Sequence, residues 1–564
     1  MKALTSSQQA WVERTFAELS PRERIGQMIL PMLTADTAKP LSIGDYVAQT
    51  GIGGGHLFGG PMEKCRRIAA EAQTAAKVPL LISGDFEVGP GERIPEGTHL
   101  PSRMAMGAAG DETLAYEAGK VTALEGRAVG YNLCYGPMVD LAAVKDYQRQ
   151  TDSYGRRPDE VSRLAVATLR GIQDHGMAGC AKHFPGDGFD DRDQHLMTLV
   201  NPLPVDQWWQ ESAVPFAAAI QAGVHSIMVS CIGLPSMDNS TGDPRNPLPA
   251  IVSRKLVTDL LRKEMGFQGV VITDALNMGG VSYHYRELDR YRLAIEAGND
   301  LLIFVRHVPK VLEYLEACLD RGELAAERID ESCHRVLELK ARLNLHQERL
   351  VSEDEARKML AGAGGPETSR RIAEKSITLV RDSKAAVPLK RTRGARVAVV
   401  LVTNQPAERF SLKDFEDTLR EAGLEVTSVR DPATDAIHDQ VAAEGFDAVV
   451  TALYFPVQYA WNTVRMHGPF SRCVMSGFPI AHPKTQPVWI SFGNPDHLYE
   501  LPFMDPYLAT YGASPAAQRA AAKALLGEIA ITGKTPAELP DFFKVGDGVE
   551  RNGGLRNGVR EKAK

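Results

Sequence analysis

One stretch in the first half of the chain concentrates side chains that can act as acids, bases and nucleophiles. Residues 179–195 read GCAKHFPGDGFDDRDQH, with Lys182 and His183 at the expected end of an apolar strand and an acid-rich loop that closes on Asp193 and His195. Charged side chains clustered at a strand end are the usual way to build a polar site on an α/β scaffold. A solvated acidic surface loop is the alternative interpretation, but a loop of this length is often functional.

Two further carboxylates follow apolar segments in the same manner. Asp85 comes just after the apolar residues 78–83, and Asp274 directly follows Val270–Thr273. A carboxylate at the end of a buried strand must be paired or functional, because burial of a lone charge is costly. The alternative for Asp274 is a cap on a following helix. A polar loop around Arg149 adds a cation to this set of candidates.

A repeating strand–helix pattern explains how these residues could be brought together. Helical patterns separate eight short apolar segments, at residues 25–33, 56–58, 78–83, 132–139, 179–181, 225–230, 270–273 and 301–304. The segments are almost continuously apolar, which is typical of parallel strands buried on both faces. Eight such units predict a (β/α)8 TIM-type barrel, an α/β fold whose active sites lie at the carboxyl ends of the strands.

The remaining chain predicts a second, separate domain. We expect the barrel to span residues 1–346, a linker 347–366, a C-terminal α/β sandwich domain 367–545, and a basic tail 546–564. Four apolar strands are predicted in the second domain, at residues 397–402, 425–429, 448–453 and 488–492. This domain could shape the pocket or mediate a homodimer, and the sequence leaves both roles open.

Composition narrows the class of protein. A chain of 564 residues with 24% charged residues and a net charge of −7 is typical of a globular protein and argues against non-specific nucleic-acid binding. Its seven scattered cysteines favour reduced core residues over a disulfide framework or a zinc site. No signal-peptide pattern and no membrane-length apolar run is present, so we expect a cytoplasmic protein without membrane or nucleic-acid partners. Ser230 lacks the Gly-x-Ser-x-Gly pattern of a serine hydrolase.

Several motifs together resemble glycoside hydrolase family 3, in particular its β-N-acetylglucosaminidase branch. The resemblance covers nearly the whole chain. It is carried by KHFPG at 182–186 with DQH at 193–195, GFQGVVITD at 266–274, AIEAGND at 294–300, DFE at 85–87, and RQTDSYG at 149–155. No single motif is decisive, but their combination is highly specific.

The resemblance implies a retaining mechanism through a covalent glycosyl-enzyme, without metal or cofactor. Asp274 would be the nucleophile, His195 the general acid and then the general base, and Asp193 the residue that orients the imidazole. We interpret Asp190 and Asp191 on the same loop as solvated. The sugar hydroxyls in the first subsite would be bound by Asp85, Arg149, Lys182 and His183. The expected enzyme removes terminal GlcNAc from small saccharides or cell-wall fragments.

Two departures from the family pattern stand out: the first changes the electrostatics of the acid-rich loop, and the second leaves the substrate open. Position 187 is Asp where the family usually has a second His, and Arg149 stands three residues before Asp152, which is closer to the β-glucosidase pattern. A β-glucosidase or a dual-specificity enzyme is therefore the main alternative. A catalytically silent sugar-binding protein is the alternative from another class, and the presence of both Asp274 and His195 argues against it.

The molecule that accepts the sugar from the glycosyl-enzyme, water or phosphate, is open as well. A carboxylate acid/base would repel an incoming phosphate ion, whereas a neutral imidazole does not. Phosphorolysis, which releases a sugar 1-phosphate, is therefore a second hypothesis beside hydrolysis, with inorganic phosphate as an additional partner.

Overall fold

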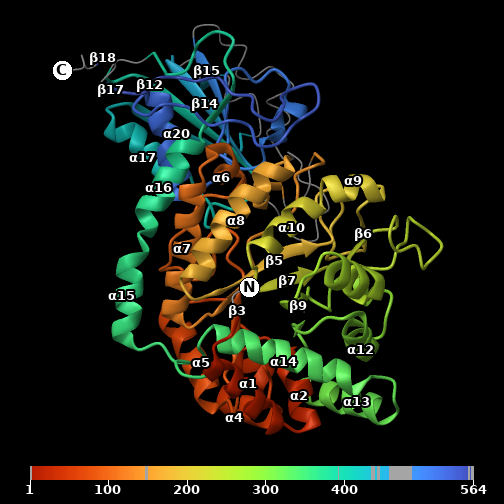
Figure 1. Ribbon diagram of the computed structural model, residues 1–564. Coiled ribbons are helices and arrows are strands. Elements are labelled where there is room, and N and C mark those ends of the chain that lie inside the picture. Colours follow the sequence, from red (N-terminus) through yellow and green to blue (C-terminus); the bar gives the residue numbers. More distant parts are fainter. Residues whose placement is uncertain are drawn as a thin grey trace. The chain divides into compact units, whose positions relative to one another are not determined.

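The computed structural model describes residues 3–145, 150–390, 393–432, 439–440, 445–456, 485–556 and 559–560 (Figure 1). The chain forms two compact units. The first comprises Met1–Thr98, Ala115–Leu141 and Val161–Gly365, and the second comprises His99–Leu114, Ala142–Glu160 and Pro366–Lys564. The predicted domains follow one another along the chain, whereas the second unit also takes in two segments from the first 160 residues.

Eight parallel strands close a barrel in the first unit (Figure 1). They are β1 (Ile29–Leu30), β2 (Gly54–His56), β3 (Leu81–Gly84), β4 (Leu133–Cys134), β5 (Ala178–Phe184), β7 (Ser226–Val229), β9 (Val270–Thr273) and β10 (Leu302–Ile303). β2-β3-β4-β5-β7-β9 pair in that order and β1 pairs with β10. Bridges from Met32 to His56 and from Ile272 to Leu301 complete the ring. The predicted barrel is confirmed, and all eight carboxyl ends lie on one face.

The barrel interior is filled by the apolar residues that predicted the strands. Its buried cluster takes side chains from successive strands, among them Leu30, Leu81, Leu133, Ala178, Met228, Val270, Ile272, Leu301 and Ile303. Packing of this kind makes the centre of the barrel a solid core and leaves polar residues to the strand ends.

Helices surround the barrel strands and follow the predicted order. Those of the first unit are α1 (Ser6–Ala17), α2 (Pro21–Gln27), α3 (Ala35–Ala38), α4 (Ile43–Thr50), α5 (Met62–Ala75), α7 (Glu112–Val129), α8 (Pro158–Asp174), α9 (Val205–Gln210), α10 (Ala213–Gln221), η4 (Lys255–Glu264), α11 (Gly279–Ser282), α12 (Glu287–Ala297), α13 (Val308–Asp320), α14 (Ala326–Arg342) and α15 (Glu353–Ala363). Residues 205–221 form two helices, α9 and α10, rather than one. Pro215 explains the break, since proline lacks an amide N–H and is accepted only in the first turn of a helix.

A buried ion cluster joins β9 and β10 at the amino ends of the strands. Asp300 is fully buried and pairs with Arg262, with Arg328 at 2.6 Å and with Arg335 at 3.2 Å. It also accepts a hydrogen bond from the Val271 amide at 2.9 Å. Burial alone would raise the pKa of Asp300, but the three arginines lower it to about 2. The segment 294–300, one of the family-like motifs, therefore has a structural role away from the predicted site.

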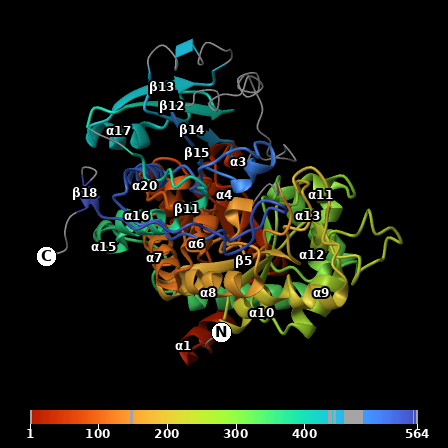
Figure 2. The same ribbon diagram turned by 90° about the horizontal axis from the view of Figure 1, so that it is seen from above.

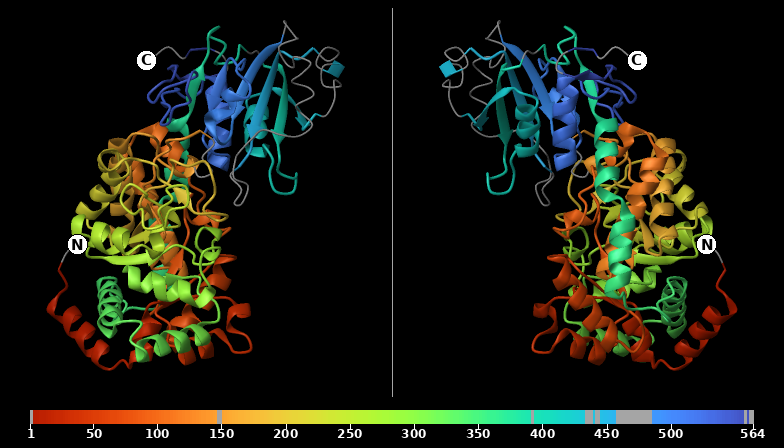
Figure 3. Two further views of the ribbon diagram at one scale, coloured as in Figure 1. Left: turned by 90° about the vertical axis from the view of Figure 1, so that its right-hand side faces the viewer. Right: turned by 90° about the vertical axis from the view of Figure 1, so that its left-hand side faces the viewer.

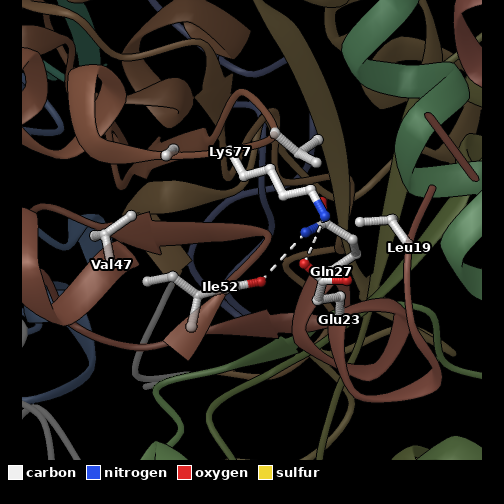
Figure 4. Close-up of a pocket in the computed structure, with 9 residues that line it drawn as sticks. Leu19, Glu23, Gln27, Val47, Ile52 and Lys77 are labelled. Carbon is white, nitrogen blue, oxygen red and sulfur yellow. Dashed lines mark hydrogen bonds and ion pairs between the residues drawn. The ribbon is translucent and has the colours of Figure 1, made fainter. Parts of the chain in front are cut away.

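A small pocket lies among the helix ends that lead into β1, β2 and β3 (Figure 4). Across it, Lys77 pairs with Glu23 at 2.7 Å and Gln27 donates a hydrogen bond to the Gly51 carbonyl at 3.2 Å. Behind it, the buried Lys340 donates to Gln27 Oε1 at 2.6 Å. The pocket faces the amino ends of these strands, so it is not part of the predicted site.

The second unit is built on a six-stranded sheet (Figure 2). Its order is β11-β16-β15-β14-β12-β13, with β11 (Thr378–Arg381), β12 (Arg396–Thr403), β13 (Glu425–Arg430), β14 (Ala448–Tyr454), β15 (Gln486–Ser491) and β16 (Tyr507–Ala509). Only β11 runs antiparallel. The α-helices described in this unit are α6 (Arg103–Ala109), α16 (Gly365–Ser376), α17 (Lys413–Glu421) and α20 (Pro515–Leu526), and α20 packs on one face of the sheet (Figure 3).

The sequence predicted four neighbouring strands of this sheet, β15, β14, β12 and β13, but missed β11 and β16. The predicted linker at 347–366 contains the whole of α15 and is therefore largely helical. At the start of the predicted tail, the Val549 amide donates to the Leu379 carbonyl at 2.7 Å, which docks it on β11. Across the described ranges, no helix combines the length and apolarity that a membrane span requires.

Candidate active site

The carboxyl ends of the barrel strands bring four predicted site residues to one face. Lys182 and His183 lie within β5, Asp85 follows β3, and Asp274 follows β9. Burial raises the pKa of the Cys180 thiol to about 12, and the negative charges of Asp85 and Asp274 both add to this effect. The two carboxylates therefore lie within electrostatic range of the same buried thiol.

Lys182 is the centre of a charged cluster at the end of β3. Its ammonium group is almost fully buried and donates to Asp85 Oδ1 at 3.2 Å and to Glu87 Oε1 at 2.6 Å. Asp85 Oδ2 lies 3.9 Å from the Nε2 atom of His56, whose pKa burial lowers to about 4. One ammonium group thus serves two carboxylates, which is a suitable arrangement for binding neighbouring sugar hydroxyls.

His183 is held by a carboxylate that the sequence analysis did not assign. Asp140 is fully buried, and its Oδ2 atom lies 2.7 Å from Nδ1 of His183. The same carboxylate accepts hydrogen bonds from the backbone amides of His183 and Asp187, at 3.1 Å and 2.8 Å. Asp140 therefore fixes both the imidazole ring and the start of the acid-rich loop. Its position just after an apolar segment was the available signal.

Asp274 is held in place by donors on both of its carboxylate oxygens. Oδ1 accepts from the Ala275 amide at 2.7 Å, and Oδ2 accepts from the hydroxyl of Ser230. Burial raises the pKa of Asp274, but the charge of His183, these two hydrogen bonds and the charge of His195 together hold it below its usual value. Asp274 is therefore a carboxylate at neutral pH.

Asp193 and His195 form a hydrogen-bonded pair on the loop after β5. Asp193 Oδ1 lies 2.7 Å from Nδ1 of His195 and accepts from the His195 amide at 2.9 Å. Asp193 is fully buried, whereas about a third of the His195 side chain is exposed (32%). A buried carboxylate behind a partly exposed imidazole is the arrangement that orients a histidine for proton transfer.

Two glycines at the start of α11 allow this loop to lie against the segment that follows Asp274. The amides of Gly279 and Gly280 donate to the carbonyls of His195 and Gln194, at 2.8 Å and 3.2 Å. A Cβ atom on Gly279 would lie 2.4 Å from the Leu196 carbonyl oxygen, so only glycine permits this approach. The imidazole predicted as acid/base and the carboxylate predicted as nucleophile therefore belong to two segments that contact each other directly.

Two predictions about this region need comment. Asp190 was interpreted as solvated, but its side chain is only 9% exposed, because it pairs with Arg192 and accepts from the Val200 amide at 2.9 Å. Asp191 is exposed, as expected. Arg149, predicted to bind the sugar, lies outside the described residues.

Comparison with known proteins places the barrel in a family. The family described as "Glycosyl hydrolase family 3 N terminal domain" matches residues 21–339. The chain belongs to glycosyl hydrolase family 3. As the sequence resemblance implied, this family 3 protein is a glycoside hydrolase with β-hexosaminidase relatives.

Three relatives of this family 3 protein match over almost its whole length. A "Beta-N-acetylglucosaminidase/beta-glucosidase" of Cellulomonas fimi is 31% identical over 94% of this chain and 95% of that protein. The solved structure of a β-glucoside phosphorylase, BglX, is 29% identical with a TM-score of 0.86, over 95% of this chain and 97% of that one. A family 3 β-N-acetylglucosaminidase from Paenibacillus sp. is 28% identical with a TM-score of 0.76, over 92% and 99%.

Proposed function

We propose that this family 3 protein is an exo-acting, retaining β-N-acetylglucosaminidase that removes terminal GlcNAc from small glycosides or cell-wall fragments. The observation that carries the proposal is the Asp193–His195 pair, docked by backbone hydrogen bonds on the segment that follows Asp274. It supplies a proton donor and a carboxylate nucleophile from two neighbouring segments. The similarity to the Cellulomonas fimi and Paenibacillus enzymes supports GlcNAc as the sugar.

In the first half of the reaction, a carboxylate oxygen of Asp274 bonds to the anomeric carbon. The bond between that carbon and the leaving oxygen breaks, and this oxygen takes a proton from His195. Asp193 engages Nδ1 of His195, so the proton comes from Nε2. In the second half, neutral His195 accepts a proton from water as the water oxygen bonds to the anomeric carbon, and Asp274 leaves as a carboxylate.

The remaining predicted residues bind the sugar. The carboxylate oxygens of Asp85 can accept hydrogen bonds from sugar hydroxyl groups, and Lys182 holds this carboxylate in position by donating to Oδ1. His183, fixed by Asp140, is a further candidate for contact with the ring, and its charge also favours the ionised form of Asp274. We retain Arg149 as a proposed sugar-binding residue on the family resemblance alone.

A second candidate function is phosphorolysis. Phosphate needs no general base, and an imidazole does not repel it as a carboxylate would. The similarity to a β-glucoside phosphorylase favours this candidate and also keeps glucose open as the sugar.

A homodimer and a cytoplasmic location remain predictions from the sequence.

Activity on two aryl glycosides tests the proposal. The full chain is assayed on the nitrophenyl β-glycosides of GlcNAc and of glucose, each with and without inorganic phosphate. We expect turnover of the GlcNAc substrate, and a sugar 1-phosphate among the products if phosphate is an acceptor. Turnover of the glucoside alone would replace the proposal by a β-glucosidase, and binding without turnover of either would identify a sugar-binding protein.

A further inference from the structure

We infer that the hydroxyl of Ser230 and the amide of Gln194 form a hydrogen-bonded relay that positions the nucleophile and ties it to the acid/base loop. The inference rests on the proposed function, because it assigns a role to two residues beside Asp274 and His195. Ser230 Oγ contacts both Gln194 Oε1 and Asp274 Oδ2. Neither Ser230 nor Gln194 was a candidate in the sequence analysis.

Ser230 faces Asp274 because of the strand register. Val229 and Thr273 are partners in the parallel pair of β7 and β9, and Ser230 and Asp274 are the next residues along each strand. The Asp274 amide also donates to the Val229 carbonyl at 2.7 Å. Ser230 is fully buried, and its own amide donates to the Phe184 carbonyl at 3.0 Å. The hydroxyl is therefore carried on a rigid part of the barrel.

The number of available protons fixes the direction of the relay. A serine hydroxyl has one proton to donate, and an ionised carboxylate can only accept. Because Asp274 is ionised at neutral pH, Ser230 must donate to Asp274. Ser230 then has no proton left for Gln194 Oε1, which faces it in the structure. We therefore exchange the oxygen and the nitrogen of this carboxamide, which keeps its shape, so that the Gln194 N–H group donates to Ser230 Oγ. The relay thus runs from Gln194 to Ser230 to Asp274.

Gln194 links this relay to the acid/base pair, because it stands between Asp193 and His195 in the chain. Its side chain is almost fully buried (2% exposed). The amides of Gly279 and Gly280 add a second, backbone anchor to this loop. Loss of the Gln194 side chain therefore removes a donor for Ser230 without removing that anchor, so a change in nucleophile chemistry can be separated from loss of the loop.

The relay favours the ionised nucleophile. The hydrogen bond from Ser230 stabilises the carboxylate form of Asp274, and the hydrogen bond from Gln194 supports Ser230 in that role. The carboxylate is the form of Asp274 that attacks the anomeric carbon, and it is also the form released when the glycosyl-enzyme is cleaved. Five titratable groups in the described part of the chain also act on Asp274 or respond to its charge: His183, His195, Tyr135, Cys180 and Cys231. A substitution at position 194 leaves all five of these residues in the chain.

The kinetic test replaces the donor by an acceptor. Gln194→Glu has nearly the same shape but competes for the Ser230 proton, and Gln194→Met removes the donor without adding charge. We expect Gln194→Glu to move the acid limb of the kcat/KM profile upward by about one pH unit relative to wild type, and Gln194→Met to move it less. An acid limb that stays in place in Gln194→Glu overturns the relay.

A second measurement needs no activity, so it separates failure of the relay from failure of the proposed function. Hydrogen exchange is followed by mass spectrometry at residues 193–198 in the full chain. We expect Asp274→Ala to make these loop amides exchange about tenfold faster, because Ser230 and Gln194 lose the acceptor that orders them. Asp85→Ala, on the same face but without contact to the relay, is the matched control and should leave the loop unchanged. Equal exchange in wild type and Asp274→Ala contradicts the relay, even if neither glycoside is turned over.

Discussion

In the proposed mechanism, one hydrogen bond decides which atom of His195 exchanges protons with a substrate. Asp193 engages Nδ1, so the proposal assigns proton transfer to Nε2. This pair could be predicted from the sequence, because two residues of one loop need no knowledge of the fold. Ser230 and Asp140 could not be predicted in the same way, since each acquires its role through a partner on another strand. A single serine or aspartate at a strand end has no partner nearby in the sequence, so no spacing distinguishes a functional residue from an ordinary polar one.

At the same scale, Asp193→Asn should disable proton transfer while leaving the loop in place. An amide can also bond the opposite tautomer of the imidazole, which then presents an unprotonated Nε2 to the leaving group. We expect kcat/KM to fall by about 10²- to 10⁴-fold on a substrate with a poor leaving group, as in other carboxylate–histidine pairs. Asp191→Asn, an exposed position on the same loop, is the control and should be near wild type. A decrease in kcat/KM of less than threefold in Asp193→Asn would contradict the role of Asp193 in orienting His195.

At the scale of elements, continuous apolar runs predicted the barrel strands, because parallel strands are buried on both faces. The strands β11 and β16 were missed since one is at the sheet edge and the other has three residues. The segment 294–300 was recognised only as a family-like pattern, and its aspartate pairs with Arg328 at the amino ends of the barrel strands. A motif can therefore be recognised from the sequence without its physical role being known.

That aspartate gives a prediction about stability. Asp300→Asn leaves three arginines without their buried counter-ion and should lower the free energy of unfolding by about 3 kcal/mol at pH 7. The folded-state pKa of about 2 lies below the usual 3.8, so the stabilisation is complete above pH 3.8 and is lost as the pH falls through 2. The difference between wild type and variant should therefore shrink in urea unfolding toward pH 2. Asp354→Asn, in an exposed pair, is the control. A difference independent of pH would contradict this role.

At the scale of the whole molecule, the barrel follows from eight repeated units that the sequence makes visible. The grouping of residues 99–114 and 142–160 with the second unit could not be predicted, because order along the chain carries no information on such contacts. The choice between GlcNAc and glucose is open for a similar reason. It depends on groups that meet around a sugar from several loops, and the full-length Cellulomonas fimi relative is named for both activities.

The central claim is that a carboxylate after β9 and an imidazole after β5 act on one sugar ring. The most direct test measures His195→Ala and Asp274→Ala on aryl glycosides with good and poor leaving groups. Asp274→Ala should be nearly inactive on all of them. His195→Ala should lose little in bond cleavage on the best leaving group and about 10²-fold or more on the poorest, because only the poorest needs a proton. Equal losses in His195→Ala across the whole series would contradict the account.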